Sequence, residues 1–310
     1  SRIFTTMITR RTLINRCLMG SVGYTLAPLC SARIEVERRP HTFQIGACDW
    51  SIERKQSPEA LKFAKQLGLD GVQVSFNGGE NDLRDKATRE LYVKTAAETG
   101  VNICSLAMGI LNGVPYSSSP DAERWVAECI EVMSTMKTEA AALSDKSLAA
   151  KVSPSIVLLA FFGKGDIKGD ETKMKEVIKR LKKVAPKAEQ AGVTIGLETW
   201  LDINDHMRIL NEVGSPAVKV YYDTANANKM GYDIYQEIET LGSNNICQIH
   251  CKENATVLGN GLVDFPRVKR VIEKIDYKGW LVIESARARG LGVEKSYLHN
   301  RSYLSELFNG

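Results

Sequence analysis

Four apolar, β-branched runs between residues 193 and 284 each end in a side chain that can bind a metal ion. The composition of these runs is typical of buried strands. They are VTIGLE (193–198), VKVYYD (218–223), ICQIH (246–250) and WLVIE (280–284), which end in Glu198, Asp223, His250 and Glu284. The terminal residues are 25, 27 and 34 positions apart, which leaves room for one strand and one helix each time. Parallel strands spaced in this way would bring the four side chains to one edge of a sheet.

The alternation of side chains along each run predicts which face of the sheet they occupy. Successive residues of a strand point to opposite faces. Glu198 shares its face with Thr194 and Gly196, and His250 shares its face with Gln248, whereas the residues between them are mostly small or apolar. A closed barrel requires this division, because one face of each strand lines the lumen and the other packs against helices.

The rest of the chain repeats the same strand-and-helix unit. Further strands are expected at residues 43–50, 71–76, 102–110 and 155–163. Residues 137–153 are rich in alanine and serine and have no strand character, so we expect an extended helix end or an insertion there. Eight units in series predict an α/β fold, a single-domain (β/α)8 TIM barrel over residues 43–310.

Residues 1–32 have the features of an export signal. Arg10 and Arg11 precede a short, weakly apolar run at 18–29, and small residues at 30–32 offer a cleavage site. The segment resembles a twin-arginine signal peptide, so an exported, periplasmic location is expected. The alternatives are a disordered or amphipathic extension, which would leave the protein cytoplasmic, or an organellar transit peptide. The apolar run is too short and too rich in glycine to span a bilayer.

The distribution of charge and cysteine excludes some classes of protein. The net charge is +4, and residues 1–32 carry four arginines and no acid, so the remainder is neutral and has no net attraction for nucleic acid. Five cysteines follow residue 32, an odd number with irregular spacing, which is a poor disulfide framework. Cys247 and Cys251 flank His250, but strand alternation predicts that both face away from it as small core residues.

The four terminal residues form a hard, oxygen-rich set of ligands. One imidazole and three carboxylates favour one Mn²⁺ or Mg²⁺ ion over structural zinc, although Co²⁺ or Zn²⁺ also fits. A sugar with adjacent hydroxyl and carbonyl oxygens could fill the open positions of such an ion. The ion would then acidify the C–H beside the carbonyl and stabilise an enediolate. Glu198 and Glu284 lie on non-adjacent strands and would flank the sugar as base and acid.

Several motifs around these residues resemble the sugar phosphate isomerase/epimerase family, the xylose-isomerase-like TIM barrels. They are LETW, YYDTANANKMGYD, IHCKE, LGNGLVDF and GWLVIES, and the resemblance covers roughly residues 43 to 290. The resemblance implies that Glu198, Asp223, His250 and Glu284 bind one divalent metal. It also implies that Glu198 and Glu284 exchange the substrate proton and that Lys252 lies near substrate oxygens.

Three further residues are candidates for substrate binding. Members of this family often carry a histidine three residues after the metal-binding aspartate, and Asn226 stands there in this chain. Asparagine donates a hydrogen bond but does not titrate near neutral pH. Trp50 and Trp200 could stack on a sugar ring, although packing at the barrel mouth is the simpler interpretation.

These observations favour a divalent-metal-dependent sugar isomerase or epimerase. The main alternative is a lyase, a dehydratase or eliminase that acts on a keto-sugar or an oxidised glycoside through the same enediolate. An AP-endonuclease-like nuclease needs several metals and many histidines, and this chain has only four histidines. A non-catalytic sugar-binding protein would not need the intact ligand set. The expected partner is a small-molecule sugar, with no nucleic acid and no membrane span, and a homo-oligomer is left open.

Overall fold

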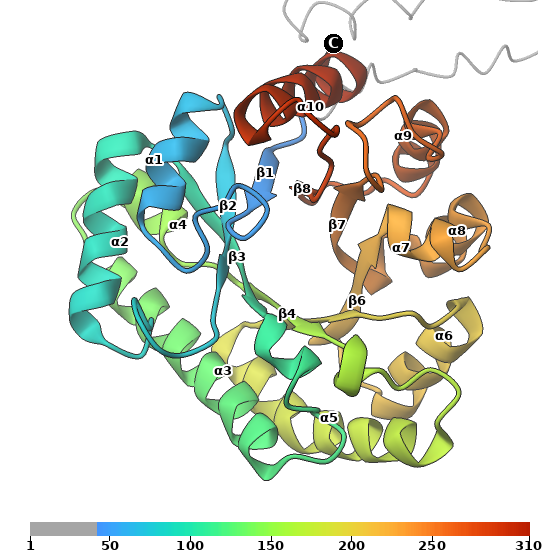
Figure 1. The fold of residues 1–310 in the computed structure, drawn as a ribbon. Coiled ribbons are helices and arrows are strands. Elements are labelled where there is room, and N and C mark those ends of the chain that lie inside the picture. Colours follow the sequence, from blue (N-terminus) through green and yellow to red (C-terminus); the bar gives the residue numbers. More distant parts are fainter. Residues whose placement is uncertain (1–41) are drawn as a thin grey trace, which may run out of the picture. The chain divides into compact units, whose positions relative to one another are not determined.

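A computed structural model of the chain describes residues 42–310, which form a closed barrel of eight parallel strands (Figure 1). The strands follow one another around the barrel in sequence order, and β1 closes it by pairing with β8. The predicted (β/α)8 TIM barrel is therefore confirmed. The strands are β1 (Ile45–Cys48), β2 (Gly71–Ser75), β3 (Asn102–Met108), β4 (Ile156–Ala160), β5 (Thr194–Glu198), β6 (Val218–Asp223), β7 (Ile246–Lys252) and β8 (Leu281–Glu284).

Helices connect the strands and surround the barrel (Figure 1). They are α1 (Glu59–Gln66), α2 (Lys86–Thr99), α3 (Pro120–Ala141), α4 (Lys146–Lys151), α5 (Glu171–Ala191), α6 (Ile203–Val213), α7 (Thr224–Lys229), α8 (Ile234–Asn245), α9 (Phe265–Lys274) and α10 (Val293–Asn309), with two 3-10 turns, η1 (Gly109–Asn112) and η2 (Gly163–Gly165). Residues 137–153 contain the end of α3 and the short helix α4, so the expected helix extension is confirmed as far as Ala141.

The alternation within each strand divides the core into an outer and an inner part. Val157 and Leu159 of β4 belong to the large apolar cluster between barrel and helices. Leu158 and Ala160 of the same strand belong to a small cluster inside the barrel, together with Tyr221. The outward residues supply the apolar surface that the amphipathic helices cover, and the inward residues fill the lumen below the site.

The C-terminal helix α10 secures the strand that begins the barrel. The Asn309 amide accepts a hydrogen bond from the Phe43 backbone N–H at 2.7 Å and donates one to the Phe43 carbonyl at 2.9 Å. Within residues 42–310 no helix is both long and apolar enough to cross a membrane. The predicted export signal, residues 1–32, lies outside the described residues and stays a prediction.

One predicted orientation is wrong because the pairing of β6 with β7 is irregular. The register shifts between Val220 and Tyr221, so the regular alternation of β7 is broken near its start. Cys247 consequently packs inside the barrel against Tyr221, not on the outer face. Cys251, beyond the irregularity, lies in the outer cluster as predicted. The five cysteines of the described chain are all free and buried.

Candidate metal centre and active site

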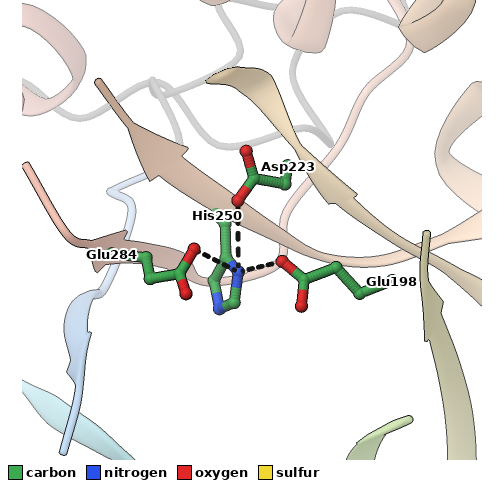
Figure 2. A group of neighbouring side chains, drawn as sticks. All are labelled: Glu198, Asp223, His250 and Glu284. Atoms are coloured by element: carbon green, nitrogen blue, oxygen red, sulfur yellow. Dashed lines mark hydrogen bonds and ion pairs between the residues drawn. The ribbon is translucent and has the colours of Figure 1, made fainter. Parts of the chain in front are cut away.

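The ends of β5 to β8 bring the four predicted ligands together. One potential ligand atom from each of Glu198, Asp223, His250 and Glu284 lies within 4.8 Å of the others, and all four residues are buried. Figure 2 shows that the three carboxylates point at the same ring nitrogen of His250. The distances from His250 Nδ1 are 2.9 Å to Glu198 Oε1, 3.6 Å to Glu284 Oε2 and 3.7 Å to Asp223 Oδ2. Residues far apart in the chain thus surround one point.

Asp223 uses its two oxygens for different purposes. Oδ1 accepts a hydrogen bond from the Asn226 backbone N–H at 2.7 Å and caps the N-terminus of α7. Oδ2 is left to face His250. The Thr224 hydroxyl accepts a hydrogen bond from the Lys252 N–H, which ties the end of β6 to β7. The capping hydrogen bond therefore orients Asp223 through Oδ1 and leaves Oδ2 available to face the site.

Lys252 lies beside the carboxylates and supplies a positive charge. Its ammonium is 2.8 Å from Glu284 Oε2 and 3.5 Å from Asp223 Oδ2, and it donates a hydrogen bond to the Asn226 amide oxygen at 3.2 Å. Burial alone would lower the pKa of Lys252, but Asp223 and Glu284 outweigh burial and hold this pKa well above its ordinary value. Burial would likewise raise the pKa of Asp223, but Lys252 and His250 hold it below the ordinary value.

The pKa of Glu198 is shifted in the opposite direction from the pKa of Asp223. Burial, together with the negative charge of Glu284, raises the pKa of Glu198 to about 7, although His250 opposes the shift. Burial of this kind is common for carboxyl groups in active sites.

The donor set fits a divalent cation. Asp223 Oδ2 and Glu284 Oε2 are buried, and their nearest positive group among residues 42–310 is the Lys252 ammonium, 3.5 and 2.8 Å away. Three buried carboxylates around one imidazole nitrogen also repel one another, so the cluster favours a cation at the point that they share. Three carboxylates and one imidazole suit Mn²⁺ or Mg²⁺. Glu198, Asp223, His250 and Glu284 would all be ligands of the same ion.

A cavity of about 230 Å³ lies beside this centre. Glu198 and Glu284 form part of its wall, and the other lining residues come from the ends of β1 to β4 and their loops: Trp50, Lys55, Ser75, Asn77, Ala107, Gly109, Asn112, Leu158, Ala160 and Phe162. The barrel is therefore divided, with ligands from β5–β8 and most of the cavity wall from β1–β4. The size of the cavity suits one sugar unit.

The two candidate tryptophans occupy different places. Trp50 lines the cavity, and its indole N–H donates a hydrogen bond to Glu284 Oε1 at 3.1 Å. Trp200 packs edge-on against Phe162, with ring centroids 4.9 Å apart, and is not among the residues that line the cavity. Asn226 is buried, and its amide oxygen is engaged by Lys252. Asn226 is thus placed to orient the lysine.

Several residues of the site were missed by the sequence reasoning. Asn77 and Asn112 line the cavity, and their amide oxygens accept hydrogen bonds from the backbone N–H groups of Ile110 and Phe162. Gln73 of β2 contacts His250 directly. The available signal for Gln73 was a polar side chain inside an otherwise apolar strand.

The chain matches the profile of the xylose isomerase-like TIM barrel family over residues 61–307. It belongs to this family, which confirms the resemblance that its motifs carry.

Its relatives include two sugar-type epimerases. The L-ribulose-5-phosphate 3-epimerase of Salmonella paratyphi A is 26% identical over 247 residues, which cover 73% of this chain and 81% of the relative. The 2-epi-5-epi-valiolone 7-phosphate 2-epimerase of an Actinoplanes species is 25% identical over 194 residues, covering 62% and 66%.

Solved structures have the same fold. The 3-keto-D-glucoside 4-epimerase of E. coli superposes with a TM-score of 0.65 at 16% identity, over 85% of this chain and 99% of that one. The D-psicose 3-epimerase of Clostridium cellulolyticum H10 gives 0.66 at 15% identity, over 86% and 99%. At these identities the similarity concerns the fold alone.

Proposed function

We propose that the protein is a sugar epimerase that uses one divalent ion, most suitably Mn²⁺. In this proposal Glu198 and Glu284 remove and replace the proton on the carbon next to the substrate ketone. The protein is an enzyme of the carbohydrate isomerase and epimerase class, as its relatives are. L-Ribulose 5-phosphate and a 3-keto-glucoside, named in the relatives above, are both keto-sugars, which supports a keto-sugar as the substrate here.

The observation that carries the proposal is the convergence of three carboxylates on His250 Nδ1 at the edge of a sugar-sized cavity. A divalent ion held there would polarise the substrate carbonyl and stabilise the negative charge that develops when the neighbouring C–H loses its proton.

Side chains of the protein carry out the proton transfers and bind the substrate. Glu198, which forms part of the cavity wall, accepts or returns the proton on one side of the sugar. Glu284, oriented by the Trp50 indole, serves the other side, since both glutamates line the cavity. One glutamate removes the C–H proton from one face, and the other glutamate, in its protonated form, delivers a proton to the opposite face, which inverts the carbon and is epimerisation. Lys252 is assigned the contact with substrate oxygens because its ammonium lies 2.8 Å from Glu284 Oε2, which belongs to a residue of the cavity wall, although Lys252 does not line the cavity itself.

The test replaces each glutamate by glutamine, which keeps the shape and one oxygen but cannot transfer a proton. We expect Glu198→Gln and Glu284→Gln to fold normally and to lower deuterium exchange from solvent into a keto-sugar by about 10²- to 10⁴-fold. Bound Mn²⁺ is measured in each variant, so that loss of metal is separated from loss of proton transfer.

Retained exchange in both variants would contradict the proposal. Product mass distinguishes the alternative chemistry, because epimerisation conserves mass whereas a dehydratase product is lighter by one water.

A further inference from the structure

We infer that Gln73 is a positioning residue, which fixes the tautomer of His250 so that Nδ1 is free to bind the ion. The inference rests on the proposed function, because that ion is the one held by Glu198, Asp223, His250 and Glu284.

The contact between Gln73 and His250 joins two strands that are not neighbours in the barrel. Gln73 lies on β2 and His250 on β7, and the Gln73 amide oxygen is 2.9 Å from His250 Nε2. An amide oxygen only accepts hydrogen bonds, which favours hydrogen on Nε2. The Cys48 sulfur also lies 3.4 Å from Nε2, but its single hydrogen is directed at the Gln73 oxygen, so this contact is compatible with hydrogen on Nε2. In the neutral imidazole the other nitrogen, Nδ1, then has a free lone pair. Nδ1 is the nitrogen that faces the three carboxylates.

The Gln73 amide has two further partners that are consistent with its orientation. Its NH₂ group donates a hydrogen bond to the Ser105 hydroxyl at 3.0 Å, and its oxygen accepts one from the Cys48 thiol at 3.3 Å. The reversed amide would direct a donor at His250 Nε2 and favour hydrogen on Nδ1, where it would compete with the ion. Residues of β1, β2 and β3 thus form one hydrogen-bonded network behind His250.

The hydrogen bond between Gln73 and His250 matters for metal binding because both side chains are buried. Gln73, Ser105, Cys48 and His250 are all fully buried at 0% exposure. Solvent therefore has no access to replace a lost partner of Nε2, and an unpaired buried N–H is costly. Outer hydrogen-bond partners of metal-binding histidines typically contribute 10- to 100-fold to metal affinity. We expect a loss of this size when the Gln73 amide is removed.

The experiment compares three variants of the full chain. Gln73→Met removes the acceptor at similar volume, and Gln73→Glu keeps an acceptor for Nε2–H. Gln248→Met is the matched control, because Gln248 is an equally buried amide of β7 whose partners are the Tyr221 hydroxyl and the Cys104 carbonyl, not His250. The Mn²⁺ dissociation constant is measured by calorimetry, and imidazole ¹⁵N shifts are recorded with diamagnetic Mg²⁺. The melting temperature of each metal-free variant reports on folding.

We expect Gln73→Met to bind Mn²⁺ about 10- to 100-fold more weakly and Gln73→Glu and Gln248→Met to stay within about fivefold of the wild type. In the loaded wild type the ¹⁵N spectrum should show His250 with hydrogen on Nε2 only. Unchanged affinity in Gln73→Met, equal losses in Gln73→Met and Gln248→Met, or hydrogen on Nδ1 would overturn the inference. A wild-type protein that binds no ion would instead contradict the proposed function.

Discussion

At the scale of single residues, Trp50 links the cavity wall to the carboxylates. Its ring lines the cavity while its N–H holds Glu284 Oε1 at 3.1 Å, so the same side chain would contact a bound substrate and orient the carboxylate proposed to transfer the proton. A charge-assisted hydrogen bond of this kind contributes more than a neutral one.

Replacing Trp50 by phenylalanine keeps an aromatic wall and removes the N–H donor together with one ring of the indole. We expect Trp50→Phe to lower kcat about tenfold or more, because one hydrogen bond to a charged group is worth about 1.5–3 kcal/mol. Trp200→Phe is the control, since Trp200 packs behind Phe162 and does not line the cavity. Steady-state kinetics and thermal melting of both variants provide the check. Equal effects of the two changes would argue against the role given to Trp50.

The sequence alone predicts that some of these residues belong to the site, but it does not indicate the others. Glu198, Asp223 and Glu284 each end an apolar strand, so a parallel sheet alone places them at one edge. Gln73 and Asn112 depend on contacts across the lumen or between loops, such as the 2.9 Å contact of Gln73 with His250. No local pattern encodes such contacts, because they arise only once the barrel has closed.

At the scale of elements, α6 is fastened to the loop after β5 by a buried histidine. His206 of α6 is buried, and its Nε2 lies 3.0 Å from the Thr199 hydroxyl. Burial lowers the pKa of His206 to about 4 from an ordinary value of 6.5. The unfolded chain therefore binds this proton more readily, and acid favours unfolding.

The lowered pKa of His206 predicts a pH dependence of stability with a definite sign. Between pH 4 and 6.5 the unfolded state holds more protons at this site, so the free energy of unfolding should rise with pH in that window. The contribution is about 3 kcal/mol, and His206→Gln should remove it and flatten the profile. Urea unfolding at several pH values measures this, and parallel profiles for wild type and variant would refute it.

The elements also show where a regular pattern fails. Strand positions followed from apolar runs, but α7 was not foreseen, because its six residues, which follow the capping residue Asp223, have no apolar period. The face of Cys247 was predicted wrongly, because the register shift between β6 and β7 depends on the pairing of two strands.

At the scale of the whole molecule, the division of the barrel organises the function. Strands β5–β8 supply the candidate metal ligands, and the ends of β1–β4 supply most of the cavity wall, as the lining residues show. Substitutions of wall residues such as Asn77 and Asn112 should therefore act on the choice of substrate, whereas Gln73, which contacts His250, belongs with the metal centre although it lies on β2.

We also propose that residues 1–32 direct export of the protein. Expressed in a bacterium with a twin-arginine pathway, the chain should reach the periplasm and lose its N-terminal segment, while Arg10→Lys with Arg11→Lys should keep it in the cytoplasm. Cell fractionation and the mass of the recovered protein decide the question. A wild-type chain found only in the cytoplasm at full length would contradict export.

The metal content of the purified chain, measured after treatment with chelator and titration with Mn²⁺, decides whether Glu198, Asp223, His250 and Glu284 form a metal centre. The wild-type chain should bind one ion and melt at a higher temperature in its presence. Asp223→Ala and His250→Ala should each lose the ion, because each removes one of the four converging ligands. A wild-type chain that takes up no Mn²⁺, Mg²⁺, Co²⁺ or Zn²⁺, or variants that bind as tightly as the wild type, would contradict this assignment.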